Sequence, residues 1–419
     1  MYRKLLFIIV ITISLPAFSA RDLYVVKSDL SEITYNTTDI DSITFDDSQI
    51  DDNYTISLHD GESVASFSVS ELNKIYLGPY FDEDDINNNE FGTTYTFTYK
   101  SSSVSVYPTP TEGITVEQNG TNIVVRSELE GINYVLKSSM YRTGSFKLYS
   151  THKSQLTLDG INLGSSNGSA INIQTGKRTF VVIADGTQNY ITDSAVYPVE
   201  TEYSEDQKAA IFSEGELLFS GKGSLNVSSL AKHGIASDDY VSIYDGNIIV
   251  VNAAKDGLKS KQKFVMKGGS LNITALDDGL DCTEGYIKID NGNINITSAD
   301  KGLVASYDSA DVVANFEVFD PSINTNITIN GGTISITTGV NASIDERKAH
   351  GIQTSSDVII NSGIVNINAN ALDKSDGINC NGSFVVNGGN ITIEANDDCY
   401  PIPIFNSGTL SCDGTIYVP

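Results

Sequence analysis

The sequence predicts an all-β protein whose larger part is a right-handed parallel β-helix. Two motifs alternate from about residue 144 to residue 400, at a spacing close to 23 residues. Apolar side chains keep a fixed phase within the copies. A repeat that cannot bury its own apolar face becomes stable when copies stack, so this pattern is typical of a solenoid. Parallel coils connected in this way are expected to be right-handed.

The first motif is a charged or small residue followed by glycine, then Ile or Leu, any residue and a small residue. Its glycines at positions 234, 257, 279 and 302 are 23, 22 and 23 residues apart. We expect each copy to form one short strand. The six copies are His233–Ser237, Asp256–Ser260, Asp278–Cys282, Lys301–Ala305, His350–Thr354 and Asp376–Cys380.

The second motif centres on a glycine, with apolar residues five and three positions before it and two and four positions after it. Around Gly292 these residues are Ile287, Ile289, Ile294 and Ile296. Period-two alternation places them on one face of two short strands. The glycine supplies the bend between the strands, where a side chain would clash or φ is positive. The centres are Gly246, Gly269, Gly292, Gly332, Gly363 and Gly389.

The alternative fold is a sandwich of antiparallel hairpins. A sandwich does not need similar side chains every 23 residues, whereas a solenoid does, because equivalent positions stack at about 4.8 Å. About eleven coils fit into residues 144–400. The most regular part is 210–395, and two stretches, Ser194–Ala209 and Tyr307–Asn326, break the period. Insertions in solenoids emerge on one side and often carry binding contacts.

The chain begins with a predicted signal peptide, residues 1–20. Arg3 and Lys4 form a basic start, Leu5–Leu15 an apolar run, and Ala17–Ser19 a small-residue cleavage signal. The apolar run is short for a membrane span, so we expect no transmembrane anchor. The protein is therefore expected to be exported, to the periplasm, the cell surface or the medium.

Three further segments are predicted. Residues 21–80 form a small β module with internal duplication, interpreted as a spacer or cap. Residues 81–95 are an acidic linker, and residues 96–419 are the β-helix with a C-terminal cap. Cys399 and Cys412 are close enough in sequence to staple that cap, since export permits disulfides. Cys282 and Cys380 share one repeat position several coils apart, too far for a bridge, and are expected to be free core thiols.

The net charge of −27 narrows the possible partners. Binding to phosphate backbones needs a basic surface, so nucleic acid is excluded as a partner. Such an acidic chain suits cations. Solubility explains part of the charge in any case.

Several fragments carry a resemblance to a known family. They are Ile183–Asn189, Ala210–Ser213, Gly221–Leu225 and Lys348–Ile352, together with the two alternating motifs. Over residues 120–400 the chain resembles a secreted bacterial carbohydrate-binding β-helix family. The resemblance implies a right-handed β-helix, similar in fold to pectate-type polysaccharide lyases. It also implies binding of acidic plant polysaccharides and cellulose, with bound calcium and without proven lyase activity.

This sequence departs from the family pattern at two kinds of position. The insertion Tyr307–Asn326 interrupts the repeat. His233, Lys301 and His350 stand where other copies carry aspartate. Both departures change positions that a metal site implied by the resemblance would use.

Aspartates just before the first-motif glycines are expected to stack on one edge of the helix, and Asp281 to project outward beside them. Calcium takes six to eight oxygen ligands, several from carboxylates. Stacked like charges repel unless a cation lies between them. The alternative is a solvated acidic edge with aspartate as a turn residue. The candidate metal ligands are Asp256, Asp277, Asp278, Asp281 and Asp300.

Lysines occupy the same edge and are candidate ligand-binding residues: Lys255, Lys259 and Lys301. A lysine beside calcium could bind a uronate carboxylate, or act as the base for β-elimination if its pKa were lowered. The alternative is plain charge balance. Sugars also stack on exposed aromatic rings. The chain has no Trp, which disfavours a platform for crystalline cellulose, and the candidate aromatic residues are Tyr240, Tyr286 and Tyr307.

Three functions are consistent with these features. The leading hypothesis is non-catalytic, calcium-assisted binding of acidic, uronate-rich polysaccharide. The second is a polysaccharide lyase acting on pectin-like substrates, and the third is a surface adhesin. The oligomeric state is not predicted.

Overall fold

The computed structural model describes residues 22–29, 31–36, 40, 42–46, 54–60, 63–77, 82–199, 204–307, 322–340, 348–371 and 374–417. The chain forms two compact units, Met1–Glu83 and Asp84–Pro419. The predicted signal peptide lies outside the described residues, as do residues 308–321 of the second insertion.

The first unit contains two three-stranded antiparallel sheets. The sheets have the orders β2-β1-β6 and β3-β4-β5. Its core is small and consists of Leu23, Val25, Leu58 and Phe67. The strands are β1 (Asp22–Lys27), β2 (Glu32–Asn36), β3 (Ser42–Asp46), β4 (Thr55–Asp60), β5 (Ser63–Ser68) and β6 (Leu72–Leu77), and a 3-10 turn covers Val69–Glu71.

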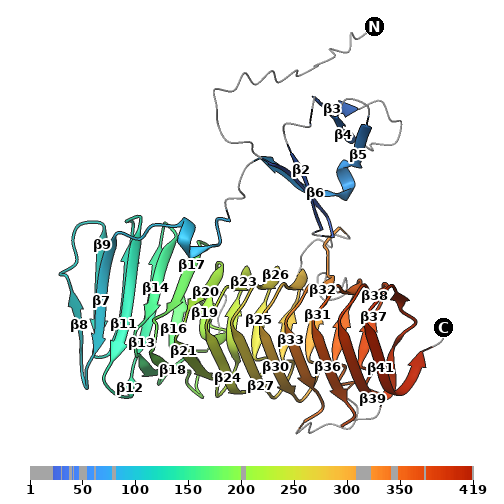
Figure 1. The fold of residues 1–419 in the computed structure, drawn as a ribbon. Helices are drawn as coiled ribbons and strands as arrows, with labels where there is room; N and C mark the ends of the chain where they lie inside the picture. Colours follow the sequence, from blue (N-terminus) through green and yellow to red (C-terminus); the bar gives the residue numbers. More distant parts are fainter. Residues whose placement is uncertain are drawn as a thin grey trace. The chain divides into compact units, whose positions relative to one another are not determined.

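The second unit is a parallel β-helix with three strands in each regular coil (Figure 1). Each strand pairs in parallel with the equivalent strand of the next coil, so Ile235 lies beside Leu258 and Leu258 beside Leu280. The exceptions are two antiparallel pairs at the N-terminal end, β7 with β8 and β9 with β10. The predicted solenoid is confirmed, and parallel pairing excludes the sandwich.

The three sheets correspond to the two motifs. We call them the first-motif sheet, the pre-glycine sheet and the post-glycine sheet. The first-motif sheet consists of β9 (Ile114–Asn119), β10 (Asn122–Ser127), β13 (Ser145–Ser150), β16 (Ile171–Ile173), β19 (Ala209–Ser213), β22 (His233–Ser237), β25 (Leu258–Ser260), β28 (Leu280–Cys282), β31 (Leu303–Ala305), β34 (Ile352–Thr354) and β37 (Ile378–Cys380).

The other two sheets flank the second-motif glycines. The pre-glycine sheet consists of β7 (Thr93–Tyr99), β8 (Val104–Tyr107), β11 (Ile132–Ser138), β14 (Ser154–Leu158), β17 (Thr179–Ile183), β20 (Leu217–Gly221), β23 (Tyr240–Ile243), β26 (Lys263–Met266), β29 (Tyr286–Ile289), β32 (Ile327–Ile329), β35 (Val358–Ile360), β38 (Phe384–Val386) and β40 (Ile404–Phe405). The post-glycine sheet consists of β12 (Arg142–Thr143), β15 (Asn162–Gly164), β18 (Gln188–Thr192), β21 (Ser224–Ser228), β24 (Asn247–Ala253), β27 (Ser270–Ala275), β30 (Asn293–Ser298), β33 (Thr333–Thr337), β36 (Ile364–Ala369), β39 (Asn390–Pro401) and β41 (Thr409–Tyr417).

The interior of the helix is filled by columns of stacked aliphatic side chains. In the post-glycine sheet Leu271, Ile294, Ile334, Val365 and Ile391 pair in sequence, and each is fully buried or nearly so. Burying one such side chain contributes roughly 1.5–3 kcal/mol relative to exposure. Each column therefore stabilises the stack, although no single coil encloses a core.

The second-motif glycines form a column at the bend between two sheets. Gly269, Gly332, Gly363 and Gly389 all have positive φ. A Cβ atom on any of them would lie 2.5–2.8 Å from the carbonyl oxygen of the equivalent glycine one coil earlier. Both reasons given for glycine at this bend are therefore confirmed.

An asparagine ladder runs along the outer surface beside that column. Asn330 donates to Asp290, Asn361 to Asn330, Asn387 to Asn361 and Asn406 to Asn387, over 2.6–2.7 Å. These side chains follow the last residue of each pre-glycine strand. The amides of Asn330, Asn361 and Asn387 each donate to the coil before and accept from the coil after, so the ladder links coils outside the core.

Replacing Asn361 by alanine should lower the free energy of unfolding by about 1 kcal/mol, because two hydrogen bonds of the ladder are lost while their exposed partners regain water. Denaturant unfolding of the full chain measures this change. The matched control is Asn381→Ala, an exposed asparagine for which no side-chain hydrogen bond occurs in the described part of the chain. Equal destabilisation by the two variants would contradict a stabilising role for the ladder.

The predicted linker differs from what the structure shows. Residues 84–91 pack on the outside of the pre-glycine sheet, where Ile86 and Phe91 contact Phe180, Leu218 and Tyr240. A 3-10 turn covers Ile86–Asn88, and β7 begins at Thr93, inside the expected linker. The acidic and Asn-rich composition of this segment predicted a linker, because its two apolar contact residues, Ile86 and Phe91, are too widely spaced to form a periodic pattern.

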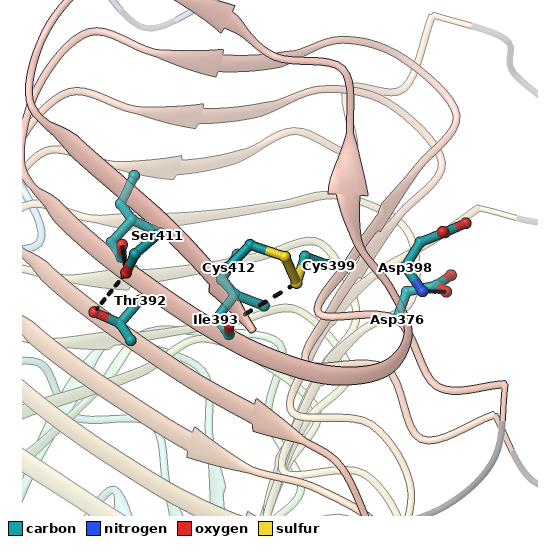
Figure 2. Close-up of a disulfide and its surroundings, with 8 residues drawn as sticks. Asp376, Thr392, Ile393, Asp398, Cys399, Ser411 and Cys412 are labelled. Atoms are coloured by element: carbon teal, nitrogen blue, oxygen red, sulfur yellow. Dashed lines mark hydrogen bonds between the residues drawn. A yellow bond between two sulfur atoms is a disulfide. The ribbon is translucent and has the colours of Figure 1, made fainter. Parts of the chain in front are cut away.

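The four cysteines lie as the sequence indicates, with one difference. A disulfide joins Cys399 in β39 to Cys412 in β41 across 6.0 Å between Cα atoms (Figure 2). It links the last two strands of the post-glycine sheet. Cys282 and Cys380 are free, and Cys282 is buried as expected, whereas Cys380 is only half-buried because it lies in the last strand of its sheet.

Candidate functional site

The candidate site is the edge where the chain enters the first-motif strands. We call it the acidic edge and define it by eight residues: Lys255, Asp256, Lys259, Asp277, Asp278, Asp281, Asp300 and Lys301. Parallel stacking brings the same repeat position of successive coils side by side. The two residues before each motif glycine therefore form two rows, and the residue two places after the glycine forms a third.

The residue directly before each motif glycine belongs to a ladder of hydrogen bonds between coils. The carboxylate of Asp256 accepts from the backbone N–H of Asp278 at 3.2 Å, and that of Asp278 accepts from the N–H of Lys301 at 2.8 Å. His233 Nδ1 accepts in the same way from the N–H of Asp256 at 3.3 Å. Asp256 and Asp278 therefore each cap a backbone donor, but neither is a solvated turn residue, because Asp256 is buried and Asp278 is half-buried.

The same ladder recurs near the C-terminus. His350 Nδ1 accepts from the N–H of Asp376 at 2.9 Å, and Asp376 accepts from the N–H of Asp398 at 3.3 Å (Figure 2). An imidazole nitrogen thus replaces a carboxylate oxygen without changing the backbone pattern. This explains two of the departures from the repeat, because His233 and His350 perform the structural task of aspartate.

Three carboxylates converge at the centre of the acidic edge. Oxygen atoms of Asp277, Asp278 and Asp300 lie within 4.8 Å of one another, with all three side chains half-buried. Lys301 lies beside them, its Nζ 3.0 Å from Asp300 and 3.7 Å from Asp278. One lysine thus faces three carboxylates, and the cluster keeps an excess of negative charge.

The pKa of Asp278 reflects this crowding. Burial raises it most, the ammonium of Lys301 lowers it, and the carboxylates of Asp256, Asp281 and Asp300 raise it again, to about 8. Low dielectric and like charges both disfavour the ionised form. A cation among the three carboxylates would favour that form.

Lys259 forms the second feature of the acidic edge. Its Nζ lies 2.5 Å from Asp281 and 3.5 Å from Asp256. Asp256 also faces His233 Nδ1 at 3.1 Å. Asp281 points away from the helix interior, as predicted, but it is buried rather than exposed, since only 7 % of its surface is accessible. Lys259 and Asp281 are therefore an ion pair rather than two solvent-facing ligands.

Burial and charge act in opposite directions on these groups. Burial lowers the pKa of Lys259, but the carboxylates of Asp281 and Asp256 outweigh it and raise that pKa above its usual value. The pKa of Lys301 is raised in the same way, against burial, by Asp278 and Asp300. For Asp256, burial alone would raise the pKa, but neighbouring groups, the ammonium of Lys259 and the backbone N–H of Asp278 among them, outweigh burial and lower it.

The donor set fits calcium. Three carboxylates offer six oxygen atoms, and a hard cation that takes six to eight oxygens matches such a set. The cluster contains neither cysteine nor histidine, the ligands that zinc and copper favour. Asp277 and Asp300 occupy the row two places before the motif glycine, next to the row of Asp278.

Sequence reasoning missed a second acidic cluster. Asp376, Asp397 and Asp398 bring their carboxylate oxygens within 4.8 Å of one another in the last coils. The signal was the dipeptide Asp397-Asp398, which repeats Asp277-Asp278. It was overlooked because Cys399 replaces the motif glycine there. A third cluster, which includes Lys208 as a bridging cation, consists of Asp206, Glu214 and Asp238.

The predicted tyrosines do not join the acidic edge. Tyr286 and Tyr307 follow the far ends of β28 and β31, so a three-residue strand of about 10 Å separates each from the aspartates. Tyr240 was predicted to be an exposed platform, and this is wrong. It is 6 % exposed, and its hydroxyl donates to Asp84 at 2.7 Å.

The fold and the acidic edge define a class of protein: a parallel β-helix solenoid with carboxylates clustered along one edge. The chain belongs to the family described as "Carbohydrate-binding domain-containing protein", whose model matches residues 113–399. The resemblance found in the sequence is thereby confirmed. No helix among the described residues is long and apolar enough to span a membrane.

Two individual proteins are similar to this chain. A "Carbohydrate-binding domain-containing protein" of Acetivibrio thermocellus is 30% identical over 95 residues, which are 23% of this chain and 33% of that protein. The match thus spans about a third of the relative's length. A solved structure titled "Structure of the polysaccharide lyase-like protein from C. thermocellum, Gadolinium derivative" is 20% identical with a TM-score of 0.48, and the similarity covers 71% of this chain and 97% of that chain.

Proposed function

We propose that the protein binds acidic, uronate-rich polysaccharide at the acidic edge, with calcium between protein and ligand and without cleaving the polymer. The carbohydrate-binding family supplies the general class of ligand. The observation that carries the finer proposal is the convergence of Asp277, Asp278 and Asp300 within 4.8 Å, with lysines beside them. We also propose that the protein is exported, as its N-terminal sequence predicts.

The charges suggest how an acidic polymer meets an acidic protein. Asp277, Asp278 and Asp300 would hold the calcium ion, which supplies positive charge that uronate carboxylates can share. Lys255 is exposed and forms no ion pair within the described residues, so its ammonium remains available to a second carboxylate. Stacked coils repeat at about 4.8 Å, which gives an extended polymer a series of regularly spaced contacts along the edge.

The lysines argue against lyase chemistry at this edge. A lysine serves as the base for β-elimination when its pKa is lowered toward neutrality. Nearby carboxylates raise the pKa of Lys259 and of Lys301, so both stay protonated at neutral pH. Protonated lysines can bind uronate carboxylates, and this supports binding over cleavage.

The decisive experiment measures binding of polygalacturonate by calorimetry, in calcium and in excess chelator, for the wild type and for Asp277→Asn combined with Asp300→Asn. We expect binding in calcium. We expect the affinity to fall about tenfold or more both on chelation and in the double variant, since each change removes charge-assisted contacts. Asp278 is left unchanged because it caps the N–H of Lys301.

The matched control is Glu112→Gln combined with Glu130→Gln. It removes two exposed carboxylates far along the helix and shifts the net charge equally. Binding that survives chelation and both double variants would overturn the calcium-assisted site. Absorbance of unsaturated products in the same mixtures tests for cleavage, and steady product formation would establish a lyase. Failure to bind any polysaccharide would leave the adhesin as the better explanation.

A further inference from the structure

A cavity lies on the outer face of the first-motif sheet in the early coils, remote in sequence from the acidic edge. Its volume is about 290 Å³. Ligand pockets begin near this size, so it accommodates one small ring rather than a long polymer segment. The lining is mostly polar and includes Asn122, Lys147, Ser169, Asn172, Pro198 and Gln207.

Parallel strands and the first insertion build the cavity. Asn122 pairs with Ser145, and Lys147 with Asn172, so β10, β13 and β16 form its floor. Gln207 comes from the insertion that breaks the repeat, and its Oε1 accepts from the backbone N–H of Ser169 at 3.1 Å. This is the behaviour expected of insertions in solenoids, which place binding contacts on one side of the coil stack.

Asn172 is the unusual residue of the lining. It is only 3 % exposed, and its Nδ2 has no hydrogen-bond partner among the described residues. Its Oδ1 accepts from Gln174 Nε2 at 2.8 Å. Gln174 Nε2 also donates to the carbonyl oxygen of Asp206 at 2.8 Å, and a carbonyl only accepts. The atom of Gln174 that faces Asn172 is therefore nitrogen, which fixes the amide of Asn172 with its own nitrogen left unpaired.

An unpaired buried amide is rare, because leaving a buried donor unsatisfied costs about 1–3 kcal/mol. The missing partner must be an acceptor, since Nδ2 only donates. The charge of Lys147 is already matched by Glu205, 2.8 Å away. A neutral ligand with hydroxyl oxygens fits these conditions better than a carboxylate. The Nδ2 atom is itself buried, so a ligand reaches it through a change of side-chain rotamer, and such changes are common on binding.

We propose that this cavity is a second glycan subsite, which takes one neutral sugar ring without calcium. A ring hydroxyl accepts from Asn172 Nδ2, and the amides of Asn122 and Gln207 face the remaining hydroxyls. The subsite goes beyond the proposed acidic edge. It shares no residue with that edge and requires neither a cation nor a uronate.

The test is saturation-transfer NMR on the full chain in excess chelator, with D-galactose, D-glucose, D-mannose, D-xylose and D-galacturonate as separate probes. Chelation silences the proposed calcium site, so the two proposals fail independently. We expect transfer to at least one neutral sugar. We expect Asn172→Leu to weaken it about fivefold or more, the size of one hydrogen bond in a desolvated site.

Two further variants complete the experiment. Asn122→Trp, at the exposed end of the floor, should fill the cavity and abolish transfer while the buried residue Asn172 stays unchanged. Asn381→Leu, an exposed asparagine in a distant coil, should leave transfer unchanged. The proposal is wrong if no neutral sugar shows transfer, if D-galacturonate alone does, or if the signal persists in both cavity variants.

Discussion

Replacing Gly332 by alanine is expected to lower the free energy of unfolding by about 3 kcal/mol or more. Gly332 has a φ of +87°, a conformation that L residues adopt only with strain. The new Cβ would lie 2.5 Å from the carbonyl oxygen of Gly292 in the preceding coil. Both atoms in this clash are fixed to backbone, so relief requires two stacked coils to separate.

Gly176→Ala is the matched control for this prediction. Gly176 is exposed, and a Cβ there would meet nothing within 4 Å. Its substitution should leave stability unchanged or slightly higher, since alanine restricts the unfolded chain. Chemical denaturation of both variants and of the wild type gives the comparison. Similar midpoints for Gly332→Ala and the wild type would show that the column tolerates side chains.

Lys259→Met should lower the free energy of unfolding by about 3 kcal/mol at pH 7, because removing one partner of a buried ion pair leaves the other charges uncompensated. Asp281 and Asp256 are both buried and both face this ammonium, at 2.5 and 3.5 Å. Lys255→Met is the control. Lys255 is exposed, so its loss should weaken polysaccharide binding and leave stability unchanged.

The effect of Lys259→Met depends on pH in a defined direction. Burial already raises the folded-state pKa of Asp281 above its unfolded value near 4, and Lys259 lowers it, so loss of the ammonium raises this pKa further and raises that of Asp256 as well. Raised carboxyl pKa values cost stability where the unfolded chain is ionised, that is above about pH 4, and this cost vanishes as the pH falls through 4. Unfolding at pH 7 and pH 4 measures the difference. A loss of stability independent of pH would point to packing rather than charge.

A double variant separates the two causes further. Lys259→Met combined with Asp281→Leu replaces the pair by apolar side chains of similar size, and such replacements are often neutral. The double variant should recover much of the stability at pH 7. If it is as unstable as the single variant, the Lys259–Asp281 pair is not the source of the effect.

The sequence by itself determined the solenoid and its repeat. Stacked coils require the same residue type at the same position. Ile therefore recurs at 294 and 334, and glycine at 292 and 332, and this period can be detected in the sequence. The pattern of one coil is sufficient to predict the fold here, because each coil has the same surroundings as the coil before it. The free cysteines and the crowding of aspartates at one edge followed from the same periodicity.

Tertiary structure decided everything that depends on contacts outside the repeat. Tyr240 is a residue type that often forms exposed sugar-binding platforms, yet Ile86 and Phe91 pack against it. Those two residues are distant in sequence and lie in a segment that resembles a linker. Asp281 faces outward by its phase but is buried against Lys259. The cavity at Asn172 exists because Gln207 returns from an insertion. The period and phase of the repeat specify which way a side chain points. Its burial and charge pairing depend on which distant segment packs against it, and the repeat pattern alone does not predict that contact.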